Sequence, residues 1–354
     1  MKKLSALFVF VIATNLLYGQ LRKVEKVVDS IILKANFNGT ILIAKNGKKE
    51  YLRYTGLADR TNSINFSAKS RFKIFSITKT FTAVLIMQLY ENGKLHLDST
   101  IAKYYPEYQG EGADKITIRN LLTYSGGREQ KDISFLAEAY NTTIWPVDTF
   151  IQRYCSGALL ETPGTKFNYN NGDYIILGRI IEKIYGKSYQ AVLQQQIIDP
   201  LKMDNTNYLH HEDIVTGMSN AYFNKEASIT DFYTPTNYYI DNYFSSGAMY
   251  STAEDLLIFD QALFNHRLLK KETVHLMLTA YPHLGEVAFG FWVYEKKFGN
   301  VNTLFAERQG YGYGFNSNWV HLIDKGVTLI ILSNTNTVDL NKMREKIITA
   351  YLGQ

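Results

Sequence analysis

The chain has 354 residues, of which 46% are hydrophobic and 20% charged, a composition typical of a globular protein. This length allows one large domain or two interleaved ones. The formal net charge of +5 is small for the size, and lysine and arginine residues form no dense cluster. The sequence therefore gives no indication of nucleic-acid binding.

The first residues are typical of an export signal. The basic start Met1–Lys3 precedes the mostly apolar run Leu4–Leu17, and Gly19 is a small residue before a possible cleavage site. The run is shorter than the roughly 20 residues that a membrane span requires. We therefore expect a signal peptide at 1–19 and a mature chain of 20–354, exported to the periplasm or the exterior, without a stable membrane span.

A β-hairpin is predicted near the start of the mature chain. The β-branched and apolar segment Gly39–Ala44 is followed by the tight-turn signal Asn46-Gly47 and by the alternating segment Glu50–Tyr54. The hairpin carries no chemistry by itself.

The segment Arg71–Gly93 holds the first candidate for catalysis. Ser76 and Lys79 are three residues apart, directly before the apolar run Phe81–Tyr90, so we expect Ser76 near a helix N-terminus and Lys79 one turn later on the same face. A serine hydroxyl becomes nucleophilic when a neighbouring group takes its proton. A helix cap followed by a solvated lysine is the structural alternative.

The same spacing occurs at Ser70 and Lys73, in a short charged stretch with no apolar run directly behind it. We therefore do not expect this second pair to be catalytic.

Helical patterns predominate in the middle of the chain, at residues 116–127, 147–187, 189–198 and 253–263. A loop rich in glycine and asparagine interrupts them and contains Tyr169 and Asn171. A tyrosine directed at a lysine loses its proton more easily, and an asparagine amide can hold the lysine or a substrate carbonyl. The alternative is a turn with a packed tyrosine, because the chain has 26 tyrosines and a second Tyr-x-Asn at Tyr222.

Two other features are predicted to be structural. Cys155 is the only cysteine, so no intrachain disulfide is possible, and we expect a small buried side chain. The segment His210–Asp213 has adjacent histidines, which do not share a helical face, and lacks a His-Glu-x-x-His pattern. We expect a polar loop there, and neither a metal site nor a cofactor.

Strand patterns return at Ala288–Tyr294, Asn316–Ile323 and Gly326–Leu332, and an amphipathic helix is predicted at Leu340–Leu352. Strands at both ends with helices between them predict an α+β fold.

A glycine-rich segment ahead of the second of these strands contains Arg308, Gly310 and Tyr311. An arginine on an edge strand beside a nucleophile could hold a substrate carboxylate, and a nearby glycine lets a substrate backbone approach. A glycine-rich hairpin with a solvated arginine is the alternative.

Together the three motifs resemble the serine β-lactamase and penicillin-binding-protein superfamily. They are Ser76-Ile-Thr-Lys79, Tyr169-Asn-Asn171 and Arg308-Gln-Gly310. The segments around and between these motifs resemble those of the class C β-lactamase-related branch, and the resemblance covers nearly the whole mature chain. The matching flanks are Phe75–Ala83, Asn92–Asp98, Leu121–Gly126, Pro163-Gly164, Pro200–Met203 and Ser246–Asp255.

The resemblance implies an antiparallel sheet made from the two ends of one domain, at about 20–80 and 285–354, with helices inserted at about 81–284. It also implies a serine hydrolase that acts on a small-molecule or peptide-like acyl substrate.

In the implied mechanism Ser76 is the nucleophile, and Lys79 and Tyr169 take its proton, with Tyr169 the favoured base. Asn171 holds the lysine and the substrate, and the backbone N–H groups of Ser76 and Tyr311 form the oxyanion hole. Arg308 and Gly310 complete the substrate site.

Two positions depart from the pattern. Arg308 stands where the superfamily usually has lysine or histidine, and it keeps the charge but cannot release a proton at neutral pH. Tyr124 stands where the branch more often has histidine, and we expect only local packing consequences.

Three functions remain open. They are a hydrolase of esters or peptide-like amides, a true β-lactamase or D-alanyl-D-alanine carboxypeptidase acting on cell-wall peptides, and a binding protein that has lost the chemistry. The sequence does not indicate an oligomeric state.

Overall fold

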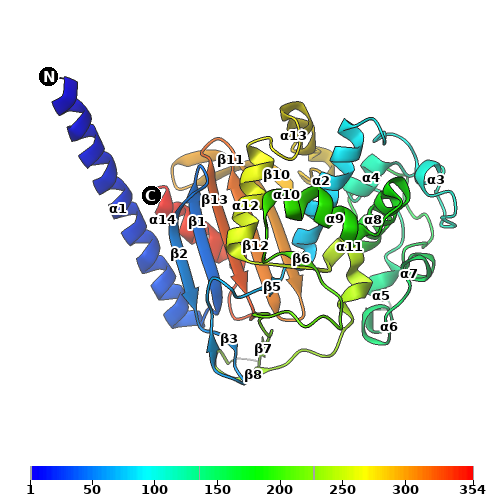
Figure 1. Ribbon diagram of the computed structural model, residues 1–354, viewed down its shortest axis with the longest axis horizontal. Helices are drawn as coiled ribbons and strands as arrows, with labels where there is room; N and C mark the ends of the chain where they lie inside the picture. Colours follow the sequence, from blue (N-terminus) through cyan, green and yellow to red (C-terminus); the bar gives the residue numbers. More distant parts are fainter. Residues whose placement is uncertain (1, 135, 226–227, 354) are drawn as a thin grey trace.

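The structure, a computed structural model, describes residues 2–134, 136–225 and 228–353, with side chains from residue 19 onward. Its centre is a six-stranded antiparallel sheet in the order β10-β11-β12-β13-β1-β2 (Figure 1). The strands are β1 Gly39–Lys45, β2 Lys48–Thr55, β10 Trp292–Phe298, β11 Val301–Gly312, β12 Phe315–Leu322 and β13 Val327–Ser333.

The two ends of the chain meet inside this sheet. β1 pairs with β13 from Gly39 opposite Ser333 to Lys45 opposite Val327. The predicted α+β fold, with a sheet from the N- and C-terminal segments, is therefore confirmed. β1 is apolar along its length because both faces are buried: Ile41 belongs to one core and Leu42 to the other.

Two terminal helices cover one face of the sheet. α1 (Lys2–Ala35) lies beside α14 (Leu340–Tyr351), and Figure 1 shows the first part of α1 extending away from the rest of the molecule. Val24 and Val28 of α1 pack with Ile347 of α14 in the core on this face. Among the described residues, no helix combines the length and the apolar character needed to cross a bilayer.

The other face carries the larger core and most helices. α2 (Thr78–Glu91) is buried along most of its length and contacts α8 (Asn171–Tyr185) and α11 (Phe244–Gly247). α12 (Ala253–Phe264) packs against β1 and β13. The remaining α-helices are α3 Ile101–Tyr104, α4 Ile118–Leu122, α5 Lys131–Ser134, α6 Leu136–Asn141, α7 Val147–Tyr154, α9 Tyr189–Leu193, α10 Asp199–Leu201 and α13 Lys271–Met277.

Short elements connect these layers. Three further sheets are formed by β3 Leu57–Asp59 with β4 Ile64–Asn65, by β5 Phe72–Lys73, β9 Met249–Ser251 and β6 Asn207–Tyr208, and by β7 Phe223–Asn224 with β8 Phe232–Tyr233. The 3-10 helices are η1 Phe75–Ile77, η3 Ile240–Tyr243 and η4 Pro282–Leu284, and the π-helical turn η2 is Gln194–Ile198.

Three predicted elements differ from the structure. The strand expected from Ala288 begins only at Trp292, because Gly290 has a φ of +80° and turns the chain. The helix predicted at 116–127 spans only Ile118–Leu122. The helix predicted at 189–198 is α-helical only as far as Leu193.

Candidate active site

The candidate nucleophile lies in a strained turn. Ser76 is the middle residue of η1, directly before α2, as the sequence predicts. The preceding residue, Phe75, has a φ of +41°, a conformation that costs on the order of 1–3 kcal/mol for a residue other than glycine. Its buried ring packs edge-on against Tyr243 at 5.5 Å and nearly parallel to Tyr313 at 6.3 Å. These ring contacts help to offset the strain.

The structure brings the first two motifs together at the Ser76 hydroxyl. Its Oγ lies 2.7 Å from Tyr169 Oη and accepts a hydrogen bond from Lys79 Nζ at 3.1 Å. Tyr169 lies two residues before α8, whose N-cap is Asn170, and Asn171 is the first residue of the helix. Ser76, Tyr169 and Asn171 are partly exposed.

Lys79 lies behind the hydroxyl and is fully buried. Besides Ser76 Oγ, its ammonium donates to Asn171 Oδ1 and to the main-chain oxygen of Ser246, each at 2.8 Å. Its three N–H groups therefore have three oxygen acceptors. The segment containing Ser246 resembles the family, but no sequence signal indicates that its carbonyl faces the lysine.

Arg308 also lies behind the nucleophile and is 0% exposed. Nε donates to the Ser76 carbonyl at 2.7 Å, and the other two nitrogens donate to Tyr124 Oη at 2.9 Å and Tyr169 Oη at 3.1 Å. Arg308 is buried because of the sheet register. The register pairs Arg308 with the fully buried Trp319, so both side chains point to the same buried face of the sheet. Each guanidinium nitrogen thus contacts a protein oxygen.

Tyr124 is more than a packing residue, so that expectation is wrong. Its hydroxyl accepts the hydrogen bond from Arg308, and its ring stacks on Tyr169 with centroids 4.7 Å apart. Trp292 lies beside the same group, 6.3 Å from the Tyr169 ring and 5.2 Å from the Arg308 guanidinium carbon.

The charges around Tyr169 favour its ionised form. Burial raises the pKa of Tyr169, but the positive charges of Lys79 and Arg308 outweigh burial and lower that pKa from 10 to about 8. Burial lowers the pKa of Lys79 to about 8, an effect that Tyr169 opposes and Arg308 reinforces. The pKa values of the tyrosine and the lysine that contact the Ser76 hydroxyl are therefore close to each other.

Asp132 is part of the site and was missed in the sequence. Asn171 Nδ2 donates to Asp132 Oδ2 at 3.1 Å, and Tyr140 Oη donates to the same oxygen at 2.8 Å. These bonds direct the Asn171 amide oxygen toward Lys79. Burial raises the pKa of Asp132, and Oδ1 has no hydrogen-bond partner among the described residues. No sequence signal distinguishes Asp132 from an ordinary acidic loop residue.

The third motif approaches the nucleophile turn closely. β10 begins at Trp292, opposite Glu307, so the residues of β11 after Glu307 extend beyond β10 and lie against η1. A Cβ on Gly310 would lie 2.1 Å from the Ile74 carbonyl oxygen, so glycine makes room here for the protein's own main chain. The next residue, Tyr311, has a side chain that is 61% exposed.

No metal site is evident in the parts of the chain that the structure describes, where no group of three or more His, Cys, Asp or Glu side chains could hold an ion. His210 is held by protein partners, with Nδ1 2.8 Å from Asp241 Oδ1 and Nε2 3.0 Å from Gln190 Oε1. Cys155 is buried and its thiol is free.

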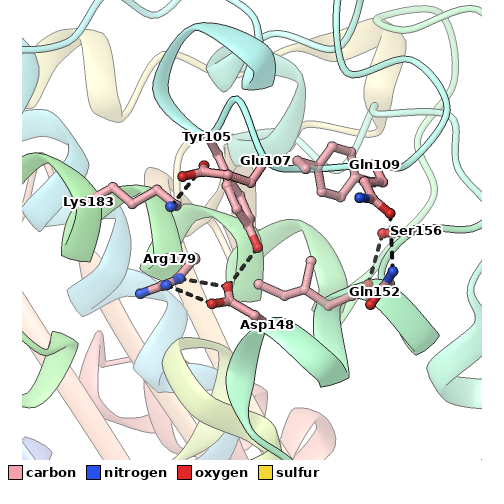
Figure 2. A pocket seen from close by; sticks show the side chains of 10 residues that line it. Tyr105, Glu107, Gln109, Asp148, Gln152, Ser156, Arg179 and Lys183 are labelled. Carbon is pink, nitrogen blue, oxygen red and sulfur yellow. Dashed lines mark hydrogen bonds and ion pairs between the residues drawn. The ribbon is translucent and has the colours of Figure 1, made fainter.

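A polar cavity of about 280 Å³ lies away from Ser76 among residues of α7, α8 and 105–109 (Figure 2). Its charges pair with one another: Arg179 with Asp148 at 2.7 Å, and Lys183 with Glu107 at 2.9 Å. These paired charges leave no evident need for a charged ligand.

Comparison with known proteins identifies the family of the chain. The model of the family described as Beta-lactamase matches residues 31–351. The chain belongs to the Beta-lactamase family. The match includes every residue of the three motifs.

The chain is similar in sequence to proteins with different names. The chain is 27% identical to penicillin-binding protein 4* of Bacillus subtilis, covering 88% of this chain and 71% of that protein. It is 24% identical to the teichoic acid D-alanine hydrolase of Staphylococcus aureus, over 75% of this chain and 65%, less than two thirds, of the relative.

The fold is also that of known hydrolases. The D-amino acid amidase of Ochrobactrum anthropi SV3, solved with D-phenylalanine, superposes with a TM-score of 0.82 at 20% identity, covering 94% of this chain and 98% of the amidase. The chain therefore has the serine hydrolase fold of penicillin-binding proteins and their relatives.

Proposed function

We propose that the protein is an exported serine hydrolase of the class C-related branch, which forms an acyl-enzyme at Ser76 and hydrolyses an ester or a peptide-like amide. The observation that carries the proposal is the position of Ser76 Oγ, in contact with both Tyr169 Oη and Lys79 Nζ. A hydroxyl that is hydrogen-bonded to a group able to take its proton, and to a cation that orients it, is an activated nucleophile.

In the acylation step, Ser76 Oγ bonds to the substrate carbonyl carbon while its proton passes to the Tyr169 phenolate. The carbonyl becomes a tetrahedral oxyanion, which the N–H groups of Ser76 and Tyr311 stabilise. One such donor lowers a barrier by ~3 kcal/mol. Tyr169 then gives its proton to the leaving alcohol or amine as the carbonyl re-forms.

Deacylation repeats this sequence with water. Tyr169 takes a proton from the water, whose oxygen attacks the acyl carbon; as the tetrahedral intermediate collapses, the bond from that carbon to Ser76 Oγ breaks and Tyr169 returns the proton to Oγ. Lys79 stays charged throughout and holds Asn171 and the hydroxyl in place. No metal or organic cofactor has a role in these steps.

The environment of Arg308 favours substrates that need no carboxylate beside the scissile bond. Its three nitrogens already donate to protein oxygens, and the side chain is fully buried. A D-alanyl-D-alanine carboxypeptidase or β-lactamase substrate carries such a carboxylate, and would have to bind it through other donors. We therefore place esters and amides of D-amino acids first, consistent with the activities that the names of the hydrolase and amidase relatives state.

The competing proposal is a binding protein without catalysis. Reaction with a serine-trapping phosphonate tests it, using the chain from residue 20 beside the Ser76→Ala variant and measuring intact mass. We expect a single adduct on the wild type alone, and loss of esterase turnover in the variant with an unchanged melting temperature. Equal turnover in the two proteins would refute the assignment of Ser76.

A further inference from the structure

A second lysine, which is half-buried, lies close to the nucleophile and takes no part in the proposed mechanism. Lys73 is on β5, three residues before Ser76, and pairs with Tyr250 of β9. The preceding residue, Phe72, points into the core, so Lys73 points to the opposite side of the strand. Burial lowers the pKa of Lys73 to about 8, the same value as that of Lys79.

The two lysines differ in their partners. Lys79 donates to three oxygens, whereas Lys73 donates to one, Tyr238 Oη at 3.0 Å, and has the Tyr238 ring 4.8 Å away. No described carboxylate lies within ion-pair distance of Lys73. A half-buried ammonium without a counter-ion is destabilised, because it has lost part of its hydration and no anion replaces the water.

Lys73 lines a cavity of about 290 Å³. The lining also includes Asn220, Asn237 and Thr236, which offer amide and hydroxyl groups, and contains no acidic side chain. The polar cavity of Figure 2 differs in this respect, since its lysine and arginine are neutralised by acidic partners. The Lys73 cavity therefore has an excess of positive charge at its wall.

The cavity is next to the nucleophile turn. Two residues of its wall, Tyr238 and Phe315, have rings 6.0 and 6.3 Å from the ring of Phe75. Tyr238 also stacks on Tyr313, with centroids 3.7 Å apart. One layer of aromatic rings thus separates the cavity from the segment that carries Ser76.

We propose that this cavity is a binding site for a small oxyanion, a carboxylate or a phosphate group, with Lys73 as its counter-ion and Asn220 and Asn237 as further donors. The inference concerns binding alone and does not depend on acyl transfer at Ser76. A bound anion would neutralise Lys73, shield its amine and raise the pKa of that amine.

Lysine acetylation, mapped by mass spectrometry, tests the proposal. The full chain is treated with acetic anhydride in chloride, acetate or inorganic phosphate at equal ionic strength. We expect acetate, phosphate or both to slow modification of Lys73 severalfold, and to leave the exposed Lys69 on the same segment unaffected. Protection by phosphate alone identifies a phosphate site, and protection by acetate alone a carboxylate site.

Thermal melting provides the second measurement. The protecting anion should raise the melting temperature of the wild type and of Lys73→Arg, which keeps the charge, but not of Lys73→Met. Equal acetylation of Lys73 in all three salts would overturn the proposal, and so would an anion effect that persists in Lys73→Met. The acetylation result stands even if the methionine variant does not fold.

Discussion

Tyr169 is the residue on which the proposed chemistry depends most. Its hydroxyl contacts the Ser76 hydroxyl and accepts a hydrogen bond from Arg308, while the Lys79 ammonium lies 5.1 Å from its ring centroid. Two buried cations beside one phenol favour the phenolate. To act as the base, Lys79 would first have to lose a proton. It would then be neutral and would have only two N–H donors for its three oxygen acceptors. Tyr169 is therefore the better candidate.

Replacing Tyr169 with phenylalanine removes the hydroxyl and keeps the ring packing. We expect kcat/KM for a chromogenic ester to fall by roughly a hundred- to ten-thousandfold, the range for loss of a general base. The melting temperature, measured in parallel, should change little. A fall of less than about threefold would assign the base to Lys79 instead.

The pH dependence follows from the same contacts. The phenolate is the reactive form and exists above the pKa of Tyr169, so kcat/KM should rise as the pH increases toward about 8, and should stop rising where Lys79, whose pKa is also about 8, loses its charge. Arg308→Met removes one of the two cations that lower this pKa, and should shift the rise to higher pH. Arg308→Lys keeps a positive charge and should shift it less. Identical profiles for the wild type and Arg308→Met would contradict a role for Arg308 in ionising the phenol.

At the scale of elements, the site depends on how closely β11 approaches η1. Gly310 and Gly312 face the nucleophile turn, where a Cβ would lie 2.1 Å from the Ile74 carbonyl oxygen or 2.5 Å from the Phe75 ring. This approach keeps Tyr311, the proposed oxyanion donor, beside η1. The two glycines thus hold together segments that are far apart in the sequence.

Gly310→Ala should separate the two elements. Overpacking of this kind costs about 1–3 kcal/mol in unfolding free energy, and here it also displaces Tyr311. We expect a lower melting temperature and a larger proportional loss of kcat. Gly126→Ala is the matched control, because its Cβ would meet no atom closer than 3.4 Å and its φ is not positive. Unchanged kcat in Gly310→Ala would show that the close approach is not required.

Elements that depend on local sequence were predictable. The hairpin around Asn46-Gly47 and the turn of Ser76 before α2 are set by neighbouring residues, and both are present. The contributions of Asp132 and the Ser246 carbonyl depend on loops that only the tertiary structure brings to Lys79. The burial of Arg308 depends on sheet register, which the sequence alone did not specify.

At the scale of the molecule, the fold is closed by segments from the two ends of the chain. β1 pairs with β13, and α1 packs beside α14 on the outer face. Because this pairing joins residues separated by most of the sequence, neither end can complete the sheet by itself. Val24 and Val28, both 0% exposed, anchor α1. They lie beyond the predicted cleavage site at residue 19.

Two truncations test this arrangement. A chain that begins at residue 20 should melt close to the full-length protein, since it keeps both valines. A chain that begins at residue 36 lacks Val24 and Val28. Burial of these two side chains contributes roughly 3 kcal/mol or more to the unfolding free energy, so the melting temperature of this chain should be markedly lower. If the shorter chain melts like the longer one, packing of α1 does not contribute to stability.

The position of Trp292 gives the molecule an internal optical probe. Of its three tryptophans, Trp292 stacks near Tyr169 and lies over the guanidinium of Arg308. Ionisation of the Tyr169 phenol would change the electric field at the Trp292 indole. The intensity and the emission maximum of the tryptophan fluorescence would change with it. Fluorescence could then follow the proton of Tyr169 in the resting enzyme, before any substrate has been found.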